Sequence, residues 1–195
     1  MDKIQYIENY LKETIQIAER IDPKIIEKMV DILLETKNNG GRVFFLGVGG
    51  GAGNGSHAAN DFNKIAKIPS ICLSDNVSLL TALTNDEGWE SVFFRQLEMH
   101  KLTPKDCLFI YSVGGGTESV SKNLVLAIDF AKKVGAKILG VVGKETGATA
   151  KMADACLVVP KVEDSRITPH TEDFQIIIDH LISNLICEIE KHEKS

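Results

Sequence analysis

Hydrophobic positions along the chain follow a helical period up to residue 39 and then change to short apolar runs. Hydrophobic side chains recur every three or four residues over 1–21 and again after Asp22 and Pro23, a pair suited to the start of a helix. Five apolar runs then cover residues 43–49, 70–75, 107–114, 137–143 and 155–160. Short runs of this kind are typical of parallel strands that are buried on both faces.

Helical patterns separate these runs, at residues 56–67, 77–84, 89–100, 118–134, 146–153 and 172–192. Strands that alternate with helices predict one doubly wound α/β domain over residues 1–195, with a five-stranded parallel sheet flanked by helices. The two helices that precede the first strand need a surface against which to bury their apolar stripes. We therefore expect residues 1–40 to form a helical pair used in oligomerisation, and residues 41–195 to form the α/β core.

Composition and charge exclude several classes of protein. The 195 residues carry 27 acidic against 22 basic side chains, a net charge of -5, and no basic run, which argues against a nucleic-acid partner. No apolar stretch approaches the ~20 residues that span a bilayer, and the N-terminus lacks the pattern of a signal peptide. No two of the four cysteines form a CxxC pair, which argues against a zinc knuckle or redox motif, and the apolar runs around Cys72, Cys107 and Cys156 predict buried, reduced thiols in strands. We predict a cytoplasmic protein without a membrane partner.

Ligands of doubly wound sheets bind beyond the carboxyl ends of the strands, and a glycine-rich segment lies at the first of these ends. Bare amides and a helix N-terminus suit a phosphate group. The candidate binding residues here are Gly49, Gly50, Gly51, Asn54 and Ser56. Residues 47–52 also fit the GxGxxA pattern of dinucleotide sites, but the acid expected about 20 residues later is Asp75, 23 residues after Ala52. We therefore rank this alternative second and expect no nucleotide cofactor.

A second phosphate-friendly segment follows the third predicted strand. It offers several short hydroxyl groups around glycines and precedes a helix. The candidate residues are Ser112, Gly114, Gly115, Thr117, Ser119 and Ser121. Two such segments at strand ends favour a small phosphorylated molecule as the substrate. Asn85 and Asp86, which follow the second predicted strand, could bind sugar hydroxyls or form a turn.

His57 and Asp61 lie four residues apart on a predicted helix and therefore share one face. Such a pair can ligate a metal ion or join a base to its orienting partner, and it can also be a surface pair. His180 lies among hydrophobic residues of the last predicted helix, where a histidine is by default part of the core.

Together these motifs resemble the sugar isomerase (SIS) domain, and most closely the phosphoheptose isomerases. The resemblance covers nearly the whole chain and implies a flavodoxin-like sheet. When the family's glycine segment is placed without gaps on Gly47, its metal-binding histidine falls on His57 and its catalytic glutamate on Asp61. A family glutamine and histidine, eight residues apart, fall on Glu172 and His180. The resemblance thus implies a Zn²⁺ site made by these four residues, with Asp61 and His180 catalytic and Glu172 also near the substrate.

The resemblance further implies an aldose–ketose isomerase that acts through an enediol and assembles as a homotetramer. The expected reaction converts sedoheptulose 7-phosphate to glycero-manno-heptose 7-phosphate, or uses a related sugar phosphate. Val48, Gly51 and Val113 replace side chains that hold substrate in the family. These departures leave open an alternative, a non-catalytic SIS module that binds a phosphosugar or serves as a scaffold.

Overall fold

The computed structural model describes residues 2–193, and of Glu193 it describes the backbone alone. Its sheet contains β1 (Val43–Gly47), β2 (Ser70–Cys72), β3 (Cys107–Ser112), β4 (Lys137–Val142) and β5 (Ala155–Val158). All pairings are parallel, in the order β2-β1-β3-β4-β5. The predicted five-stranded parallel sheet is confirmed. The order of the strands reverses direction between β1 and β3, the place where doubly wound sheets bind ligands.

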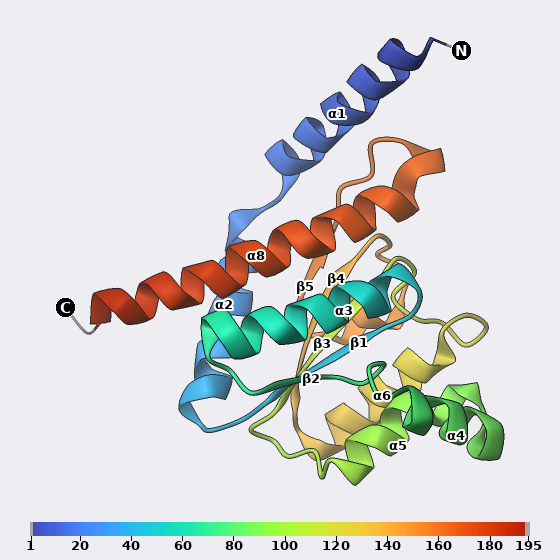
Figure 1. Ribbon diagram of the computed structural model, residues 1–195, viewed down its shortest axis with the longest axis vertical. Coiled ribbons are helices and arrows are strands. Elements are labelled where there is room, and N and C mark those ends of the chain that lie inside the picture. The colour runs from blue at the N-terminus through green and yellow to red at the C-terminus, as the bar shows by residue number, and fades with distance from the viewer. Residues whose placement is uncertain (1, 194–195) are drawn as a thin grey trace.

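Helices cover both faces of the sheet (Figure 1). One hydrophobic cluster joins the sheet to α2 (Pro23–Asn38), α3 (Gly50–Asp61), the π-helical turn η1 (Phe62–Ala66) and α8 (Ile167–Glu193). A second cluster on the other face involves α4 (Val77–Glu87), α5 (Val92–Met99), α6 (Lys122–Val134) and α7 (Ala148–Met152). The remaining elements are α1 (Lys3–Arg20) and the 3-10 turns η2 (Trp89–Ser91) and η3 (Asp164–Arg166). The doubly wound architecture is confirmed.

Three helices begin four or more residues from their predicted starts. Helix α3 starts at Gly50, six residues before the predicted start, so most of the glycine-rich segment is helix and not a loop. Glycine is required there for close packing, because a Cβ on Gly51 would lie 2.4 Å from the backbone oxygen of Tyr111. Helix α8 starts at Ile167 with Pro169 in its first turn, where proline is tolerated. Helix α6 starts at Lys122, four residues after the predicted start.

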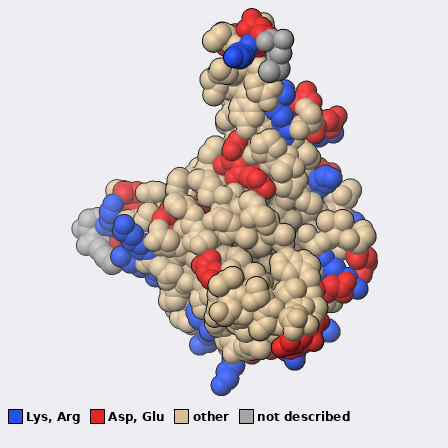
Figure 2. All heavy atoms as spheres, turned by 45° about the vertical axis from the view of Figure 1, so that its right-hand side comes forward, with Lys and Arg blue, Asp and Glu red and all other residues tan. Residues whose placement is uncertain are grey.

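The two N-terminal helices behave differently. Met29 and Leu33 of α2 are fully buried in the chain's own core, so α2 needs no partner subunit to cover its apolar stripe. Helix α1 stands off the body as a column whose visible side is largely uncharged in Figure 2, and Ile17 is its one buried residue among those described. The exposed hydrophobic side chains of α1 are Ile4, Tyr6, Ile7, Leu11 and Ile15.

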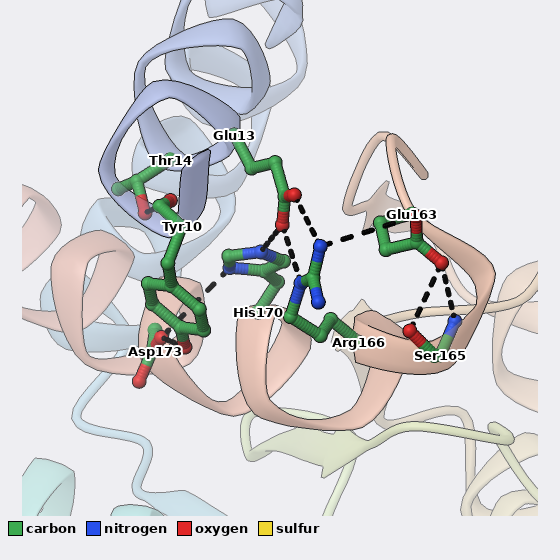
Figure 3. Close-up of polar contacts among 8 residues, drawn as sticks. All are labelled: Tyr10, Glu13, Thr14, Glu163, Ser165, Arg166, His170 and Asp173. Atoms are coloured by element: carbon green, nitrogen blue, oxygen red, sulfur yellow. Dashed lines mark hydrogen bonds and ion pairs between the residues drawn. The ribbon is translucent and has the colours of Figure 1, made fainter. Parts of the chain in front are cut away.

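Polar contacts hold α1 against the beginning of α8 (Figure 3). The Glu13 carboxylate accepts hydrogen bonds from the Arg166 guanidinium and lies 2.9 Å from Nε2 of His170. The hydroxyl of Tyr10 donates to Asp173 at 2.6 Å. The hydrogen bond from Arg166 is the main reason that the pKa of Glu13 falls from 4.5 to about 2. These contacts fix the direction of a helix that buries little apolar surface.

Replacing Glu13 with Gln should loosen α1 selectively. Loss of the charged contacts should destabilise the attachment of α1 by about 1.5–3 kcal/mol, because hydrogen bonds to charged groups are worth that much. Amide hydrogen exchange should therefore quicken in α1 and stay unchanged in β1 and β3. A carboxylate whose pKa is lowered on folding stabilises the folded protein at pH values above its unfolded pKa. The difference in stability between Glu13→Gln and the parent protein should therefore be complete at pH 7 and should shrink as the pH falls from about 4.5 towards 2. Equal exchange in α1 at neutral pH would contradict this assignment.

Two further expectations concern cysteines and membranes. The four cysteines are free, with Cys72 and Cys107 buried and Cys156 and Cys187 half-buried. The prediction of reduced thiols therefore agrees with the structure, although Cys156 is less buried than expected. Within residues 2–193, none of the helices combines the length and the hydrophobicity that crossing a membrane requires.

Candidate functional site

Helices α3 and α8 bring four potential ligands together beside the sheet. His57 and Asp61 come from α3, and Asp179 and His180 from α8; one ligand atom of each lies within 4.8 Å of the others. The two imidazole Nε2 atoms are 3.0 Å apart, and Oδ2 of Asp61 lies 3.4 Å from that of His57 and 3.5 Å from that of His180. The structure thus brings together three of the four residues that the family resemblance implied. We call this group of four residues the His–Asp cluster.

The local fold explains this convergence. Helix α3 begins directly after β1, and the spacing of four residues places His57 and Asp61 on one face of it. That face lies against α8, which runs beside α3 across the same side of the sheet (Figure 1). About half of each imidazole is exposed, whereas Asp61 is 7% exposed, so the cluster opens to solvent at its histidines.

Asp179 is the member of the cluster that the sequence analysis missed. It is fully buried, and neither of its carboxylate oxygens has a hydrogen-bond partner. Burial, with a smaller contribution from the negative charge of Asp61, raises the pKa of Asp179 from 3.8 to about 7. An acidic residue directly after three isoleucines was the available signal, because an unpaired carboxylate is costly in an apolar environment.

A buried tyrosine belongs to the same surroundings. The hydroxyl of Tyr111, on β3, is fully buried and lacks a hydrogen-bond partner. Burial, and then the charge of Asp179, raise the pKa of Tyr111 well above its ordinary value. The Tyr111 hydroxyl and the Asp179 carboxylate are therefore both buried without a hydrogen-bond partner in the described chain.

The residues of the cluster fit a divalent cation. Two imidazoles and two carboxylates are ligands that Zn²⁺ accepts in tetrahedral sites. With bonds of about 2.0–2.2 Å, ligand atoms of a tetrahedral site lie about 3.3–3.6 Å apart. The separations of 3.0, 3.4 and 3.5 Å are close to that range. Among residues 2–193, no Lys or Arg forms an ion pair with either carboxylate.

Glu172, the fourth implied metal ligand, lies elsewhere. A Cβ on Gly50 would come within 2.4 Å of Oε2 of Glu172, so this carboxylate rests against the first turn of α3. The physical reason is length, since the eight residues that separate Glu172 from His180 span about 12 Å of helix. Glu172 occupies the positive end of the α3 dipole, where the sequence analysis placed a phosphate.

The other candidates near the glycine-rich segment have structural contacts of their own. The side-chain amide of Asn54 donates to the backbone oxygen of Glu172 and to Oε1 of Gln175, both at 2.9 Å, and so ties α3 to α8. Gly49 is exposed and adopts a φ of 62°. Ser56 lines a cavity of about 550 Å³ beside β2, which no member of the His–Asp cluster lines.

The hydroxyl-rich segment lies, as expected, at the carboxyl end of β3. Ser112 ends the strand, and its hydroxyl accepts a hydrogen bond from the backbone N–H of Gly115. The hydroxyl of Thr117 accepts a hydrogen bond from the N–H of Val120. Ser119 is exposed, Ser121 takes a left-handed conformation just before α6, and Gly114 is half-buried. The segment is folded on itself with its hydroxyl groups near a helix N-terminus.

Asn85 and Asp86 do not join the His–Asp cluster. Both are exposed in the last turn of α4, and the amide of Asn85 donates to Oδ1 of Asp86. Helix α4 packs on the opposite face of the sheet from α3 and α8. The hydrophobic pattern predicts a helix that ends at residue 84, but α4 continues through both residues to Glu87.

Comparison with known proteins agrees with this architecture. The SIS domain family matches residues 5–143. The phosphoheptose isomerase of Aneurinibacillus thermoaerophilus is 30% identical over 193 residues, which cover 94% of this chain and 93% of that protein. The phosphoheptose isomerase of a Nitratiruptor species is 36% identical over 162 residues, 80% of this chain and 82% of that protein. The solved structure of a phosphoheptose isomerase from Francisella tularensis superimposes with a TM-score of 0.83 at 22% identity, over 96% of this chain and 100% of that one.

The strand order and the cluster beside the sheet define a flavodoxin-like α/β protein with a candidate catalytic or metal site. Within that class, the chain belongs to the SIS domain family. The resemblance inferred from the sequence motifs is therefore confirmed. The roles of the individual residues remain predictions.

Proposed function

We propose that this protein is a phosphosugar aldose–ketose isomerase. The observation that carries the proposal is the meeting of His57, Asp61 and His180 between α3 and α8, in a chain similar over most of its length to phosphoheptose isomerases. The proposed reaction converts sedoheptulose 7-phosphate to glycero-manno-heptose 7-phosphate or acts on a related sugar phosphate, in keeping with the names of these relatives.

In the proposed mechanism, Asp61 removes the proton from the carbon next to the carbonyl group and returns it to the neighbouring carbon. His180 either donates a proton to the carbonyl oxygen and accepts one from the adjacent hydroxyl, or holds a cation that would polarise that oxygen instead; in both cases the substrate passes through an enediol. Oδ1 of Asp61 accepts a hydrogen bond from Asn60, which fixes the carboxylate, while Oδ2 faces both imidazoles. A divalent cation held by the His–Asp cluster would supply polarisation of the sugar oxygens.

The substrate phosphate is proposed to bind at the hydroxyl-rich segment after β3. Hydroxyl groups and bare amides near the start of α6 can surround the phosphate without a basic side chain. Glu172 reaches the start of α3 and therefore leaves the β3 segment as the better of the two predicted phosphate sites. No nucleotide cofactor is part of the proposal.

The test is turnover of purified protein with ketose phosphates of five to eight carbons, followed by NMR for the aldose product. Appearance of an aldose phosphate supports the isomerase. Binding of the same compounds without turnover, with the cation present, would favour the alternative of a non-catalytic phosphosugar-binding module.

We also propose that the protein is a cytoplasmic homotetramer in which α1 contacts other copies of the chain. The exposed apolar stripe of α1 supports this, as do the exposed residues Ile177, Leu181 and Leu185 of α8. Contiguous exposed apolar surface of this kind marks interaction sites.

Replacing Leu11 with Lys should therefore weaken assembly. A charge in the middle of the α1 stripe should shift the protein from tetramer towards smaller species in light scattering coupled to size-exclusion chromatography, with little change in stability of the single chain, because Leu11 is 58% exposed. Gln16→Lys adds the same charge to an exposed position beside the stripe and serves as the control. An unchanged tetramer in Leu11→Lys would contradict the proposed role of α1.

A further inference from the structure

The environment of Asp179 is unfavourable for a charged carboxylate. It is fully buried on α8, both of its oxygens lack hydrogen-bond partners, and a second carboxylate, Asp61, lies close by. Among the described residues, neither Lys nor Arg pairs with it. Burying an unpaired charge costs several kcal/mol, and a like charge nearby increases that cost.

The two histidines cannot relieve this cost by hydrogen bonding in the arrangement seen. Nε2 of His57 and Nε2 of His180 face one another at 3.0 Å, and both also face Asp61. Nitrogen atoms that converge with carboxylate oxygens on one point are arranged as ligands around a common centre. The buried, unpartnered carboxylate of Asp179 belongs to the same group, because one of its oxygens lies within 4.8 Å of the ligand atoms of the other three residues.

We propose that Asp179, and not Glu172, completes the divalent-cation site with His57, Asp61 and His180. Two carboxylates would balance the charge of the cation, and Asp179 would gain the partner that it lacks within the described chain. Glu172 cannot also bind the cation, since its carboxylate rests against Gly50 at the start of α3. The inference concerns the site of the proposed isomerase, but it needs only cation binding and not turnover.

Metal binding by the purified protein tests this ligand set. Protein stripped with a chelator is titrated with Zn²⁺ against a chromophoric competitor, and the bound metal is counted by mass spectrometry. We expect one Zn²⁺ per chain in the parent protein. Asp179→Asn, which keeps the shape and removes the charge, should weaken Zn²⁺ affinity by about tenfold or more, because even groups that only support a ligand are worth about that much.

Glu172→Ala is the control on the same helix, because it removes the other implied ligand completely, whereas glutamine would keep an oxygen ligand. It should leave Zn²⁺ affinity within about threefold of that of the parent protein. The reverse result, with Glu172→Ala weakening the affinity and Asp179→Asn leaving it unchanged, would overturn the proposal. Absence of Zn²⁺ binding by the parent protein would also overturn it.

Thermal unfolding separates a ligand from a structural residue. Without metal, Asp179→Asn should be at least as stable as the parent protein, because it removes an uncompensated buried charge. The rise in Tm on adding Zn²⁺ should be smaller in Asp179→Asn than in the parent protein or Glu172→Ala. A less stable metal-free variant with a full Zn²⁺-induced rise would assign Asp179 to packing and refute the proposal.

The same samples distinguish this inference from the proposed function. If the parent protein binds one Zn²⁺ through Asp179 and converts none of the ketose phosphates, the ligand set stands and the isomerase proposal fails. If turnover is found but Zn²⁺ affinity does not depend on Asp179, the isomerase proposal stands and the ligand set fails.

Discussion

Replacing Asp61 with Asn should lower kcat for the ketose phosphate by about 10³-fold, since a positioned general base typically contributes 10²–10⁴. The amide cannot accept the carbon-bound proton, yet it fills the same space and can still accept the hydrogen bond from Asn60 that now reaches Oδ1. The phosphosugar should still bind within a few-fold of its original Kd, because the proposed phosphate contacts come from the segment after β3. NMR turnover and calorimetric binding measure the two quantities separately.

Asp31→Asn is the control for this variant, because it removes an exposed carboxylate on α2. It should leave both kcat and Kd unchanged. The assignment of Asp61 as the base fails if Asp61→Asn retains full turnover. Since Asp61 is also in the His–Asp cluster, the assay is run with saturating Zn²⁺, so that weaker metal binding does not by itself account for the loss.

A Gly51→Ala substitution should have the largest effect on stability. The added Cβ would lie 2.4 Å from the backbone oxygen of Tyr111, so α3 would have to move away from β3. Overpacking against a rigid backbone costs about 3 kcal/mol, more than the roughly 1 kcal/mol that alanine gains over glycine in a helix. The net loss should lower Tm by roughly 4–8 °C.

Gly53→Ala is the matched control, since it makes the same change two residues further along α3. A Cβ at Gly53 meets nothing within 4 Å, so only the gain in helix propensity remains and Tm should stay equal or rise slightly. Equal Tm values for the two variants would show that the contact between α3 and β3 does not depend on a glycine at position 51.

The sequence was sufficient for the sheet and for half of the site. Five apolar runs predicted the five strands, because strands buried on both faces leave no polar positions. His57 and Asp61 could be paired from their spacing alone, because two residues four apart on a helix always share a face. The resemblance to the SIS family then added His180, which periodicity alone assigned to the core.

The starts of helices were harder to predict than the strands, as Gly50 and Gly51 at the start of α3 show. Glycine is a poor helix former, so a run of glycines indicates a loop in any reading of local propensity. In this fold the same glycines form the first turn of α3, because contact with β3 and with Glu172 leaves no room for a Cβ. The constraint comes from residues more than 50 positions away, which a local pattern does not contain.

The sequence by itself therefore determined the class of fold, the strands, the family and the His57–Asp61 pair, since each depends on short-range spacing or on a motif. Only the tertiary structure decided that Asp179 and not Glu172 lies beside that pair, and that α2 is covered by its own sheet whereas α1 is not. The physical reason is that the crossing of α3 and α8 selects which turn of α8 faces the pair. That crossing is set by packing on the sheet, which the order of residues along either helix does not reveal.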